Sequence, residues 1–339
     1  MTMQDPFKHP DMTEYHFRTG RSPDFKRGKW RIELSKVLMA FVLVFCFTGV
    51  TFMPQRVTAA GPQRVIYYYQ TLTELSPLIN TLNPATGRPY TTDINLASFH
   101  LGPQSDGTLI HLNDLPPDNP AFNTAWRQLG KLQSMGVKVH MMLGGAAPGS
   151  YRSLFSDWAT LYPVLRQTLL RYHFDGIDLD IEEEVALSDV EHLICLLSSD
   201  FGVGFSITLA PVASDLISGR GLSGFNYKDL YHSAEGAKIA WFNTQFYSGF
   251  GSLATTFDYN AIINNGFPPD KVVAGMLGNP HEGSGYVDVK RVAGTVEQLA
   301  ATYSNFAGVF SWEYFDTLPG GTAHPEQWSE LMYQAMKGN

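Results

Sequence analysis

The sequence predicts a closed barrel of eight parallel strands with helices between them, the (β/α)8 or TIM-barrel fold. Short runs rich in β-branched and aromatic residues recur from Arg64 onward, and helix-length segments separate them. This alternation is typical of βα units in a parallel sheet, and eight such units in about 280 residues suit a closed barrel. No internal repeat, Pro-rich linker or low-complexity tract divides the region. We therefore expect residues 61–339 to form one domain.

The expected strands follow one another along this domain at similar spacing. In chain order they are VIYYY from Val65, INLASF from Ile94, VKVHMML from Val137, GIDLDIE from Gly176, GFSITLA from Gly204, IAWFNTQFY from Ile239, KVVAGM from Lys271 and AGVFSW from Ala307. Apolar residues at helical spacing lie between them, for example from Leu154 to Tyr172 and from Leu193 to Phe201. In such a barrel, reactive groups lie at the carboxyl ends of the strands.

The fourth strand carries a row of acids, because carboxyl and apolar side chains alternate in FDGIDLDIEEE, residues 174–184. In an extended strand Asp178, Asp180 and Glu182 share one face, and the intervening Ile and Leu residues share the other. Carboxyl groups roughly 6 to 7 Å apart on one face repel each other, so one of them can stay protonated near neutral pH. A proton donor beside an ionised carboxylate is what glycosidic bond cleavage requires. The alternative is a structural or cation-binding strand end.

The sixth strand points to the same site. Its alternation places a polar and aromatic set on one face and an apolar set on the other. The first set is Trp241, Asn243, Gln245 and Tyr247, and the second is Phe242, Thr244 and Phe246. We expect the first set to line the lumen, with Tyr247 near substrate at the carboxyl end of the strand. The alternative is that Asn243 and Gln245 only fill the barrel.

Three further residues follow other strands. Trp312 closes the eighth strand and is the kind of aromatic residue that stacks under a sugar ring, although many single tryptophans belong to the core. Gly144 and Gly145 in LGGAAPGS do not fit a nucleotide-binding fingerprint. We expect them instead to let the backbone approach a ligand at the end of the third strand.

Other catalytic chemistries have little support in the sequence. His192 and Cys195 share a helical turn without further ligands, and no HExxH spacing occurs. We therefore expect no metal and no cofactor, and a buried structural Cys195. No GxSxG nucleophile motif is present either.

The first 60 residues differ in kind from the rest. They contain nine of the 24 Lys and Arg and five of the 32 Asp and Glu, so the remainder carries 15 basic and 27 acidic residues, a net charge of −12. Such a charge disfavours nucleic acid as a partner. Only Cys195 remains after residue 60, so this region has no intrachain disulfide.

Residues 1–60 have the organisation of a targeting segment. A basic flank precedes the apolar run VLMAFVLVFCFTGVTFM from Val37 to Met53, and small residues end at Ala60. This order predicts a secretory signal cleaved after Ala60 and a secreted, extracellular protein. The basic flank is long for a signal peptide, and a 17-residue run is near the lower limit for spanning a bilayer. The alternative is therefore a type II membrane anchor in the secretory pathway, and a start at Met12 would shorten the flank.

The acid row resembles a known signature. DGIDLDIE, from Asp175 to Glu182, matches the DGxDxDxE motif of glycoside hydrolase family 18, and the resemblance extends from about Arg64 to Trp328. Within the family the chain looks most like the fungal endo-β-N-acetylglucosaminidases, which release N-glycans from glycoproteins. Class III chitinases are the nearest relatives with another substrate. The matching segments are HLNDLPPD from His111, GGAAPGSY from Gly144, TLAPVAS from Thr208, WFNTQFYSGFGS from Trp241, KVVAGML from Lys271 and WEYFDTLPGGTA from Trp312.

The resemblance implies a role for each catalytic residue. Glu182 would be the general acid and later the base that activates water. Asp180 would orient the 2-acetamido group of the substrate, which acts as the nucleophile, so that no enzyme nucleophile is needed. Asp178 would share a proton with Asp180, and Tyr247 would donate a hydrogen bond to the acetamido oxygen with Gln245 beside it.

The remaining residues would support the substrate. Trp312 would form the floor under the sugar next to the cleaved bond, and Tyr68 would flank that sugar. Asp175 would support the acid row from the start of the strand, and Asn243, Gly144 and Gly145 complete the expected substrate-binding set. The chain departs from the SxGG pattern common in chitinases of the family, because Met142 replaces the serine. Glu183 and Glu184 have no role by resemblance.

Three functions remain possible at this stage. The first is a retaining endoglycosidase acting on the GlcNAc-β1,4-GlcNAc core of N-glycans, and the second is a chitinase that breaks the same linkage in chitin. The third is an inactive carbohydrate-binding protein built on the same barrel. Such proteins usually lack the catalytic acid, whereas Glu182 is present here. The expected partners are therefore N-glycans of glycoproteins or chitin oligosaccharides, and no obligate protein partner is evident.

Overall fold

Eight parallel strands close into a barrel in the part of the chain that the computed structural model describes, residues 63–219 and 221–338. The first strand closes the ring, because it pairs with the last strand on one side and with the second barrel strand on the other. The predicted TIM-barrel fold is confirmed. In order around the barrel the strands are β1 (Arg64–Tyr69), β4 (Asp93–Leu101), β6 (Lys138–Gly144), β7 (Gly176–Asp180), β8 (Ser206–Leu209), β9 (Ile239–Gln245), β10 (Val272–Leu277) and β11 (Gly308–Trp312).

Three short strands lie outside the barrel ring and were not expected. β5 (Ile110–Leu112) pairs antiparallel with the end of β4, and β2 (Leu82–Asn83) pairs with β3 (Arg88–Pro89). Each has only two or three residues, too few for a periodic pattern to be visible in the sequence.

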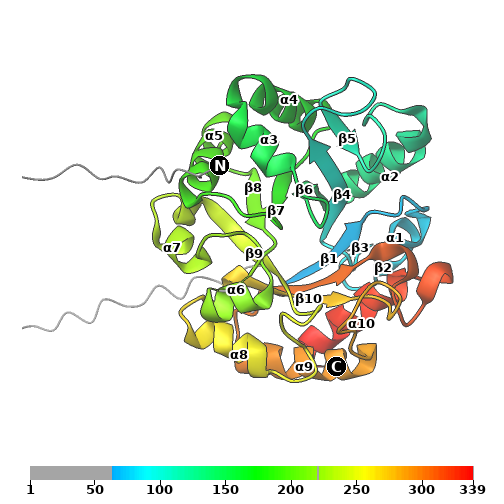
Figure 1. Ribbon diagram of the computed structural model, residues 1–339. Coiled ribbons are helices and arrows are strands. Elements are labelled where there is room, and N and C mark those ends of the chain that lie inside the picture. The colour runs from blue at the N-terminus through cyan, green and yellow to red at the C-terminus, as the bar shows by residue number, and fades with distance from the viewer. Residues whose placement is uncertain (1–62, 220, 339) are drawn as a thin grey trace, which may run out of the picture. The chain divides into compact units, whose positions relative to one another are not determined.

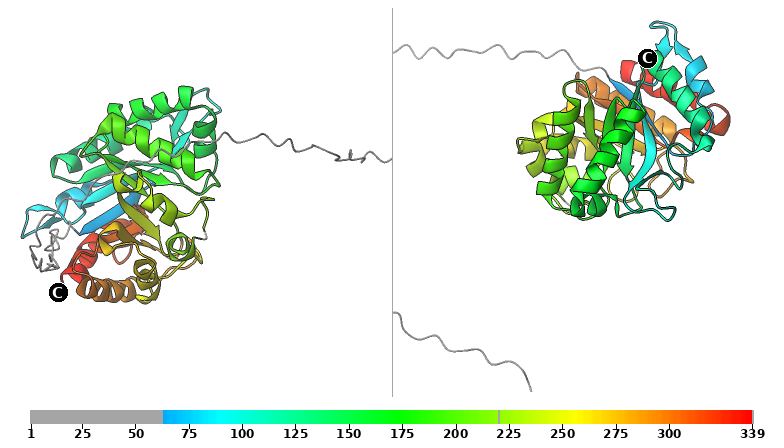
Figure 2. Two further views of the ribbon diagram at one scale, coloured as in Figure 1. Left: turned by 90° about the vertical axis from the view of Figure 1, so that its left-hand side faces the viewer. Right: turned by 90° about the horizontal axis from the view of Figure 1, so that it is seen from above.

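Helices surround the ring of strands, as Figure 1 and the two views of Figure 2 show. They are α1 (Ser76–Asn80), α2 (Asn123–Ser134), α3 (Ser150–Ser156), α4 (Trp158–Arg171), α5 (Leu187–Phe201), α6 (Ala213–Ser218), α7 (Tyr227–His232), α8 (Phe257–Asn264), α9 (Val289–Thr302) and α10 (Glu326–Lys337). Single 3-10 turns lie at Pro120–Phe122, Gly236–Lys238, Pro269–Lys271, Tyr314–Asp316 and Gly321–Ala323.

The helical stretch expected from Leu154 to Tyr172 is two helices rather than one. α3 ends at Ser156, and the Asp157 side chain accepts a hydrogen bond from the backbone N–H of Thr160, which caps the start of α4. On α5 the expectation for Cys195 was wrong, since its side chain is exposed. The apolar stripe of that helix consists of Val190, Leu193, Ile194 and Leu197 instead.

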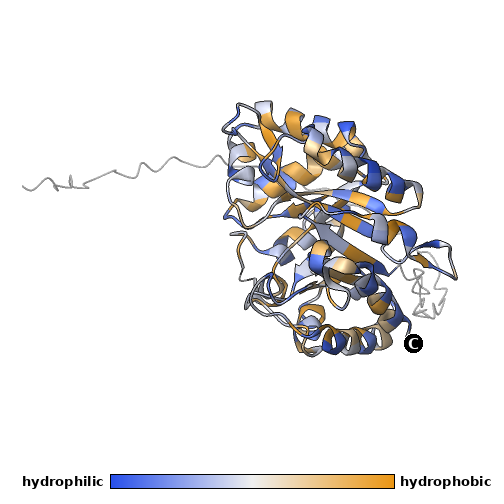
Figure 3. Ribbon diagram, turned by 90° about the vertical axis from the view of Figure 1, so that its right-hand side faces the viewer, coloured by the Kyte–Doolittle hydropathy of each residue, from blue (hydrophilic) through white to orange (hydrophobic). Residues whose placement is uncertain are grey.

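Two apolar clusters lie on opposite faces of the strands. The outer cluster contains Ile177, Leu179 and Ile181 and joins the strands to the helices. The outer helices carry both hydrophobic and hydrophilic residues along their length, as Figure 3 shows. The inner cluster fills the barrel and contains Tyr68, Ala97, Met142, Trp241, Tyr247 and Phe310. The side chains that were predicted to alternate along the fourth and sixth strands thus point in turn to the outer cluster and to the inside of the barrel.

Met142, which stands at the serine position of the chitinase pattern, packs inside the barrel. Its side chain is fully buried in the inner cluster, next to Asp178 in the register of β6 and β7. Ser98 directs its hydroxyl at the Met142 sulfur over 3.7 Å. The thioether therefore packs beside the acid row, inside the barrel.

The expected signal or anchor segment, from Val37 to Met53 with cleavage after Ala60, lies outside the described residues. Among the residues that are described, no helix has the length and apolar character needed to cross a membrane.

The ends of β6 and β7 approach each other closely at Gly144. Gly144 has φ +96°, and a Cβ there would lie 2.3 Å from the backbone oxygen of Asp180. The next residue, Gly145, donates its backbone N–H to that same oxygen at 3.0 Å. Glycine at position 144 therefore permits the approach that holds the third strand against the acid row.

We predict that Gly144→Ala lowers the free energy of unfolding by about 2 kcal/mol or more, because it combines a backbone clash with a left-handed φ. Chemical denaturation measures the change. Gly130→Ala is the matched control, since Gly130 lies within α2 with open space around it and should gain about 0.5 to 1 kcal/mol. Equal stability of Gly144→Ala and the wild type would contradict the argument.

Candidate active site

A cavity of about 420 Å³ opens at the carboxyl ends of the barrel strands. This size is within the range of small-ligand sites. Its wall contains seven of the residues singled out in the sequence, and these come from four different strands or the turns after them. They are Gly144, Gly145, Asp180, Glu182, Gln245, Tyr247 and Trp312.

The three acids of the row lie at increasing exposure toward the cavity. Asp178 is fully buried in the barrel, Asp180 is 4% exposed at the cavity floor, and Glu182 is partly exposed in the wall. β7 ends at Asp180, so Glu182 follows the strand rather than ending it as expected. The row therefore leads from the barrel core to the cavity.

Burial shifts the ionisation of all three acids in the same direction. The pKa of Asp180 is raised well above its ordinary value by burial, and the charges of Glu182 and Asp178 add to the effect. Burial also raises the pKa of Glu182, against a hydrogen bond from Gln245. Burial raises the pKa of Asp178 too, while hydrogen bonds from neighbouring donors lower it. Such a row holds a proton above the pH at which isolated carboxyl groups lose theirs.

Gln245 links the two acids that reach the cavity. Its side-chain nitrogen donates to the backbone oxygen of Ala210 at 2.9 Å, to Asp180 Oδ1 at 3.1 Å and to Glu182 Oε1 at 3.3 Å. The amide therefore fixes both carboxyl groups relative to the start of the loop after β8.

Aromatic side chains form another part of the site. Trp312 and Tyr247 both line the cavity, and Phe250 lies beside them in its wall. Tyr68 packs its ring against Trp312 with 5.5 Å between centroids, but only 2% of the residue is exposed. Its hydroxyl donates to Asp178 Oδ2 at 2.6 Å. Tyr68 thus supports the acid row and the tryptophan from inside the barrel.

Besides Tyr68, two expected substrate-binding residues do not reach the cavity. Asn243 has no exposed surface, and its amide donates to Asp178 Oδ1 at 2.9 Å. Asp175 lies before the start of β7, at the opposite end of the strand from the cavity. There it accepts from the backbone N–H of Val139 at 3.0 Å and from the Lys138 ammonium at 2.7 Å. The sequence pattern gives the face of a side chain, but not its depth along the barrel.

Glu183 has a structural role that the sequence analysis missed. It is 4% exposed, and its Oε1 accepts from the backbone N–H groups of Gly149 at 3.0 Å and Tyr151 at 2.8 Å. Oε2 pairs with Arg152 at 3.1 Å. The carboxylate therefore anchors the first turn of α3 and the loop before it. Its only signal in the sequence was its position directly after Glu182.

Glu282 is a second missed residue, and it lines the cavity. Its two carboxyl oxygens are buried without a hydrogen-bond partner, and so is Oδ1 of Asp316. Burial, together with the interaction with Asp316, raises the pKa of Glu282 to about 9. Both causes favour the protonated form, so Glu282 presents a neutral acid to the cavity.

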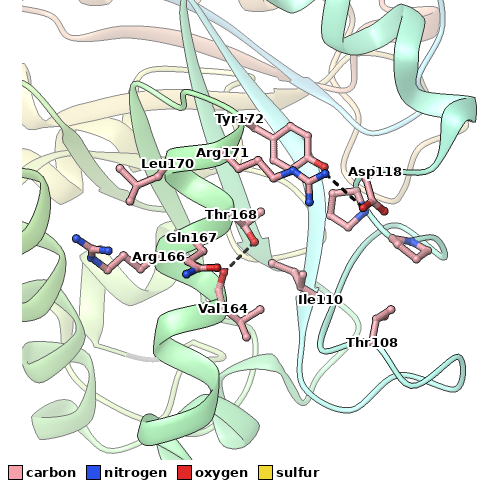
Figure 4. A pocket seen from close by; sticks show the side chains of 12 residues that line it. Thr108, Ile110, Asp118, Val164, Arg166, Gln167, Thr168, Leu170, Arg171 and Tyr172 are labelled. Atoms are coloured by element: carbon pink, nitrogen blue, oxygen red, sulfur yellow. Dashed lines mark hydrogen bonds and ion pairs between the residues drawn. The ribbon is translucent and has the colours of Figure 1, made fainter.

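A second cavity, of about 610 Å³, lies between α4 and the chain from Thr108 to Asp118 (Figure 4). Its charged side chains are already paired, since Arg171 contacts Asp118 at 3.4 Å and Arg166 contacts Asp200 at 3.1 Å. Asp118 is the one acid among its lining residues, whereas Asp180, Glu182 and Glu282 line the smaller cavity, which is therefore the candidate active site. In neither place, nor elsewhere in the described residues, do three or more His, Cys, Asp or Glu gather as they would around a metal ion.

Comparisons with known proteins agree on one family. A solved fungal endo-β-N-acetylglucosaminidase from glycosyl hydrolase family 18 is 41% identical, with a TM-score of 0.74, over 81% of this chain and 98% of that one. The chain belongs to glycoside hydrolase family 18. A solved chitinase from Aspergillus fumigatus is 40% identical, with a TM-score of 0.71, over 81% of this chain and all of that one.

Among curated proteins, Endochitinase 4 of Metarhizium robertsii is 21% identical over 239 residues, which are 57% of this chain and 68% of the relative. No family model matches the chain. The predicted family is thus confirmed, and the family 18 protein is a glycoside hydrolase acting on GlcNAc linkages. The relatives divide between two substrates, so the identities alone do not separate them.

Glu282 gives this family 18 hydrolase a pH-dependent stability. In the unfolded chain the carboxyl ionises near its ordinary pKa of 4.5, whereas in the folded protein it keeps its proton up to about pH 9. Between these values the folded state binds the extra proton. Stability therefore falls as pH rises through this window, and the loss is complete above about pH 9.

We predict that Glu282→Gln, which is neutral at every pH, matches the wild type in Tm near pH 4 and exceeds it increasingly toward pH 9. Differential scanning calorimetry across this range measures the difference. Glu297→Gln, at an exposed position of α9, is the control and should show no such divergence. A constant difference between Glu282→Gln and wild type at all pH values would show that the carboxyl is not held neutral.

Proposed function

We propose that this hydrolase is a retaining endo-β-N-acetylglucosaminidase that cleaves the GlcNAc-β1,4-GlcNAc core of N-glycans. The observation that carries the proposal is the acid row, which rises into one cavity beside Tyr247 and Trp312. The relative at 41% identity supports the substrate, since the chain spans 98% of that enzyme. Five of the six segments that resemble fungal enzymes of this type contribute residues to the wall of the same cavity, whereas HLNDLPPD from His111 lies beside the larger cavity.

In this proposal Glu182 donates its proton to the leaving glycosidic oxygen. Its carboxyl group is in the cavity wall, and burial raises its pKa, so it retains a proton to give under weakly acidic conditions. The bond between the anomeric carbon and that oxygen breaks. The aglycone half leaves with the proton.

The nucleophile in this proposal is the 2-acetamido group of the substrate. Its carbonyl oxygen bonds to the anomeric carbon and forms an oxazolinium ion, whose positive charge lies next to Asp180. Tyr247 donates a hydrogen bond to the acetamido oxygen and Trp312 stacks under the sugar. Ionised Glu182 then removes a proton from water, which attacks the anomeric carbon and restores the acetamido group. Two displacements at one carbon give retention of configuration.

Chitin hydrolysis is the second candidate. The chitinase from Aspergillus fumigatus is matched over all of its length at 40% identity, and its substrate contains the same linkage. The acid row serves both reactions equally, so the choice depends on the loops that surround the cavity.

A parallel digestion tests the proposal. A glycoprotein with high-mannose N-glycans and a series of chitin oligomers are incubated with the enzyme, and released sugars are identified by mass spectrometry. Release of glycans that have lost one GlcNAc supports the proposal. Cleavage of chitin oligomers without glycan release would establish the chitinase instead, and inactivity toward both would indicate a carbohydrate-binding protein.

We predict that Glu182→Gln lowers turnover at least about 10³-fold while glycan binding is retained, because the amide keeps the shape of the acid but has no proton to donate. Calorimetric titration with a defined glycan measures the binding. Glu184→Gln, at an exposed position two residues along the chain, is the matched control and should turn over substrate like the wild type. Undiminished turnover by Glu182→Gln would refute the assigned role.

A further inference from the structure

Asp178 is held by four donors in the barrel core. Its Oδ1 accepts from the Thr208 hydroxyl at 2.5 Å and from the Asn243 amide at 2.9 Å. Its Oδ2 accepts from the Tyr68 hydroxyl at 2.6 Å and from the Asn95 amide at 3.3 Å. An ionised carboxylate offers about four acceptor positions. Four donors therefore fill it, and this arrangement suits the charged form of Asp178.

The two amide donors are oriented by different partners. A hydroxyl can turn and accept, whereas an amide presents its NH₂ to Asp178 only when its oxygen is held on the other side. For Asn243 that partner is Trp241, whose indole nitrogen donates to the amide oxygen at 2.8 Å. An indole N–H is always a donor, so the orientation of Asn243 does not depend on pH.

The orientation of Asn95 depends on the proton of a histidine. The amide oxygen of Asn95 lies 3.1 Å from Nδ1 of His140, which can either donate or accept. His140 has no exposed surface, and burial lowers its pKa against the opposing charges of Asp93 and Asp178. Burial thus favours the neutral ring, which holds the amide oxygen only when its single N–H is on Nδ1.

The other ring nitrogen is consistent with this tautomer. Nε2 of His140 is buried without a hydrogen-bond partner, and the nearest carboxylate oxygen, on Asp93, is 3.8 Å away. An N–H on Nδ1 has the Asn95 oxygen within hydrogen-bond distance, whereas an N–H on Nε2 would have its nearest carboxylate oxygen beyond that distance. The proton is accordingly on the side of Asn95.

We infer that His140 is a positioning residue for the acid row: the proton on its Nδ1 fixes the Asn95 amide, which keeps Asp178 ionised. The inference rests on the proposed function, in which Glu182 donates the proton and Asp180 lies next to the oxazolinium ion. If the ring proton were on Nε2 instead, Asn95 could turn its oxygen to Asp178. A proton transferred from Asp180 to Asp178 would then be favoured.

Other charged or titratable groups surround His140, Asn95 and Asp178. They are Arg64 and Tyr68 on β1, Asp93 on β4, Asp175 and Asp180 on or next to β7, Tyr151 on α3, Tyr227 on α7 and Tyr247 after β9. Burial raises the pKa of each of these tyrosines, so they stay neutral in the working range. A change in the acidic limb of the kcat/KM profile therefore comes from the carboxyl groups or His140.

The tautomer can be read directly in the wild-type protein. Two-dimensional ¹⁵N NMR of labelled imidazoles distinguishes a protonated Nδ1 from a protonated Nε2. We expect His140 to show a neutral ring with the proton on Nδ1 through the weakly acidic range. A proton on Nε2, or a doubly protonated ring, would overturn the inference whether or not the substrate has been identified.

Two variants separate positioning from packing. His140→Met fills the space without a donor, and we expect the acidic limb of its kcat/KM profile to move to higher pH by about one unit, since a charged acceptor loses support. His140→Asn keeps an N–H close to the position of Nδ1 and should rescue the profile. His111→Gln is the control and should not shift the profile, since His111 lies on β5 and pairs with Asp106.

The outcomes distinguish failure of the His140 inference from failure of the proposed function. A wild-type profile for His140→Met, or equal shifts for both variants at position 140, would assign His140 to packing alone. A wild type that cleaves neither N-glycans nor chitin oligomers would contradict the proposed function, and the NMR tautomer would then decide the inference alone. Should His140→Met fail to fold, the same measurement and His140→Asn still decide it.

Discussion

The burial of negative charge inside the barrel is the constraint on which the rest of the site depends. Three neighbouring carboxyl groups, two on β7 and one just after it, cannot all ionise at this degree of burial unless donors compensate them. The structure meets this requirement at the bottom of the row, where four neutral donors surround Asp178. Fewer donors remain for Asp180 and Glu182, the two acids of the row that line the cavity, where the proposed mechanism needs a proton.

The barrel supplies these donors because its inner face is not purely apolar. Aromatic rings and Met142 fill most of the lumen, and the polar side chains lie between them at successive depths. Trp241 shows how the two kinds of residue combine, since its ring is covered by the Arg64 guanidinium at 3.9 Å while its N–H orients Asn243. Packing at one end of the barrel is thereby connected with ionisation at the other.

The sequence predicted the parts of this arrangement that repeat. Alternation along single strands identified the barrel, the acid row and the inner face of the sixth strand, because a side chain's face depends only on its position in the strand. Tyr68 and Asn243 were expected to contact substrate but lie inside the barrel, since depth depends on how strands are staggered around the ring. Asp175 lies directly before its strand, where it was expected. Glu183 and Glu282 were missed because their partners come from other loops. The inward orientation of His140 and Asn95 could have been predicted, since each occupies an alternate position on the inner face of an expected strand.

The anchoring of α3 by Glu183 has a consequence for exchanging loops among relatives. The loop after β6 forms one wall of the cavity, and its far end is fastened to the residue that directly follows Glu182. A transplanted loop lacking backbone donors at the positions of Gly149 and Tyr151 would leave a buried carboxylate without hydrogen bonds beside Glu182, the proposed proton donor. Grafts meant to change which oligosaccharide is accepted should therefore carry the turn and its glutamate together as one unit.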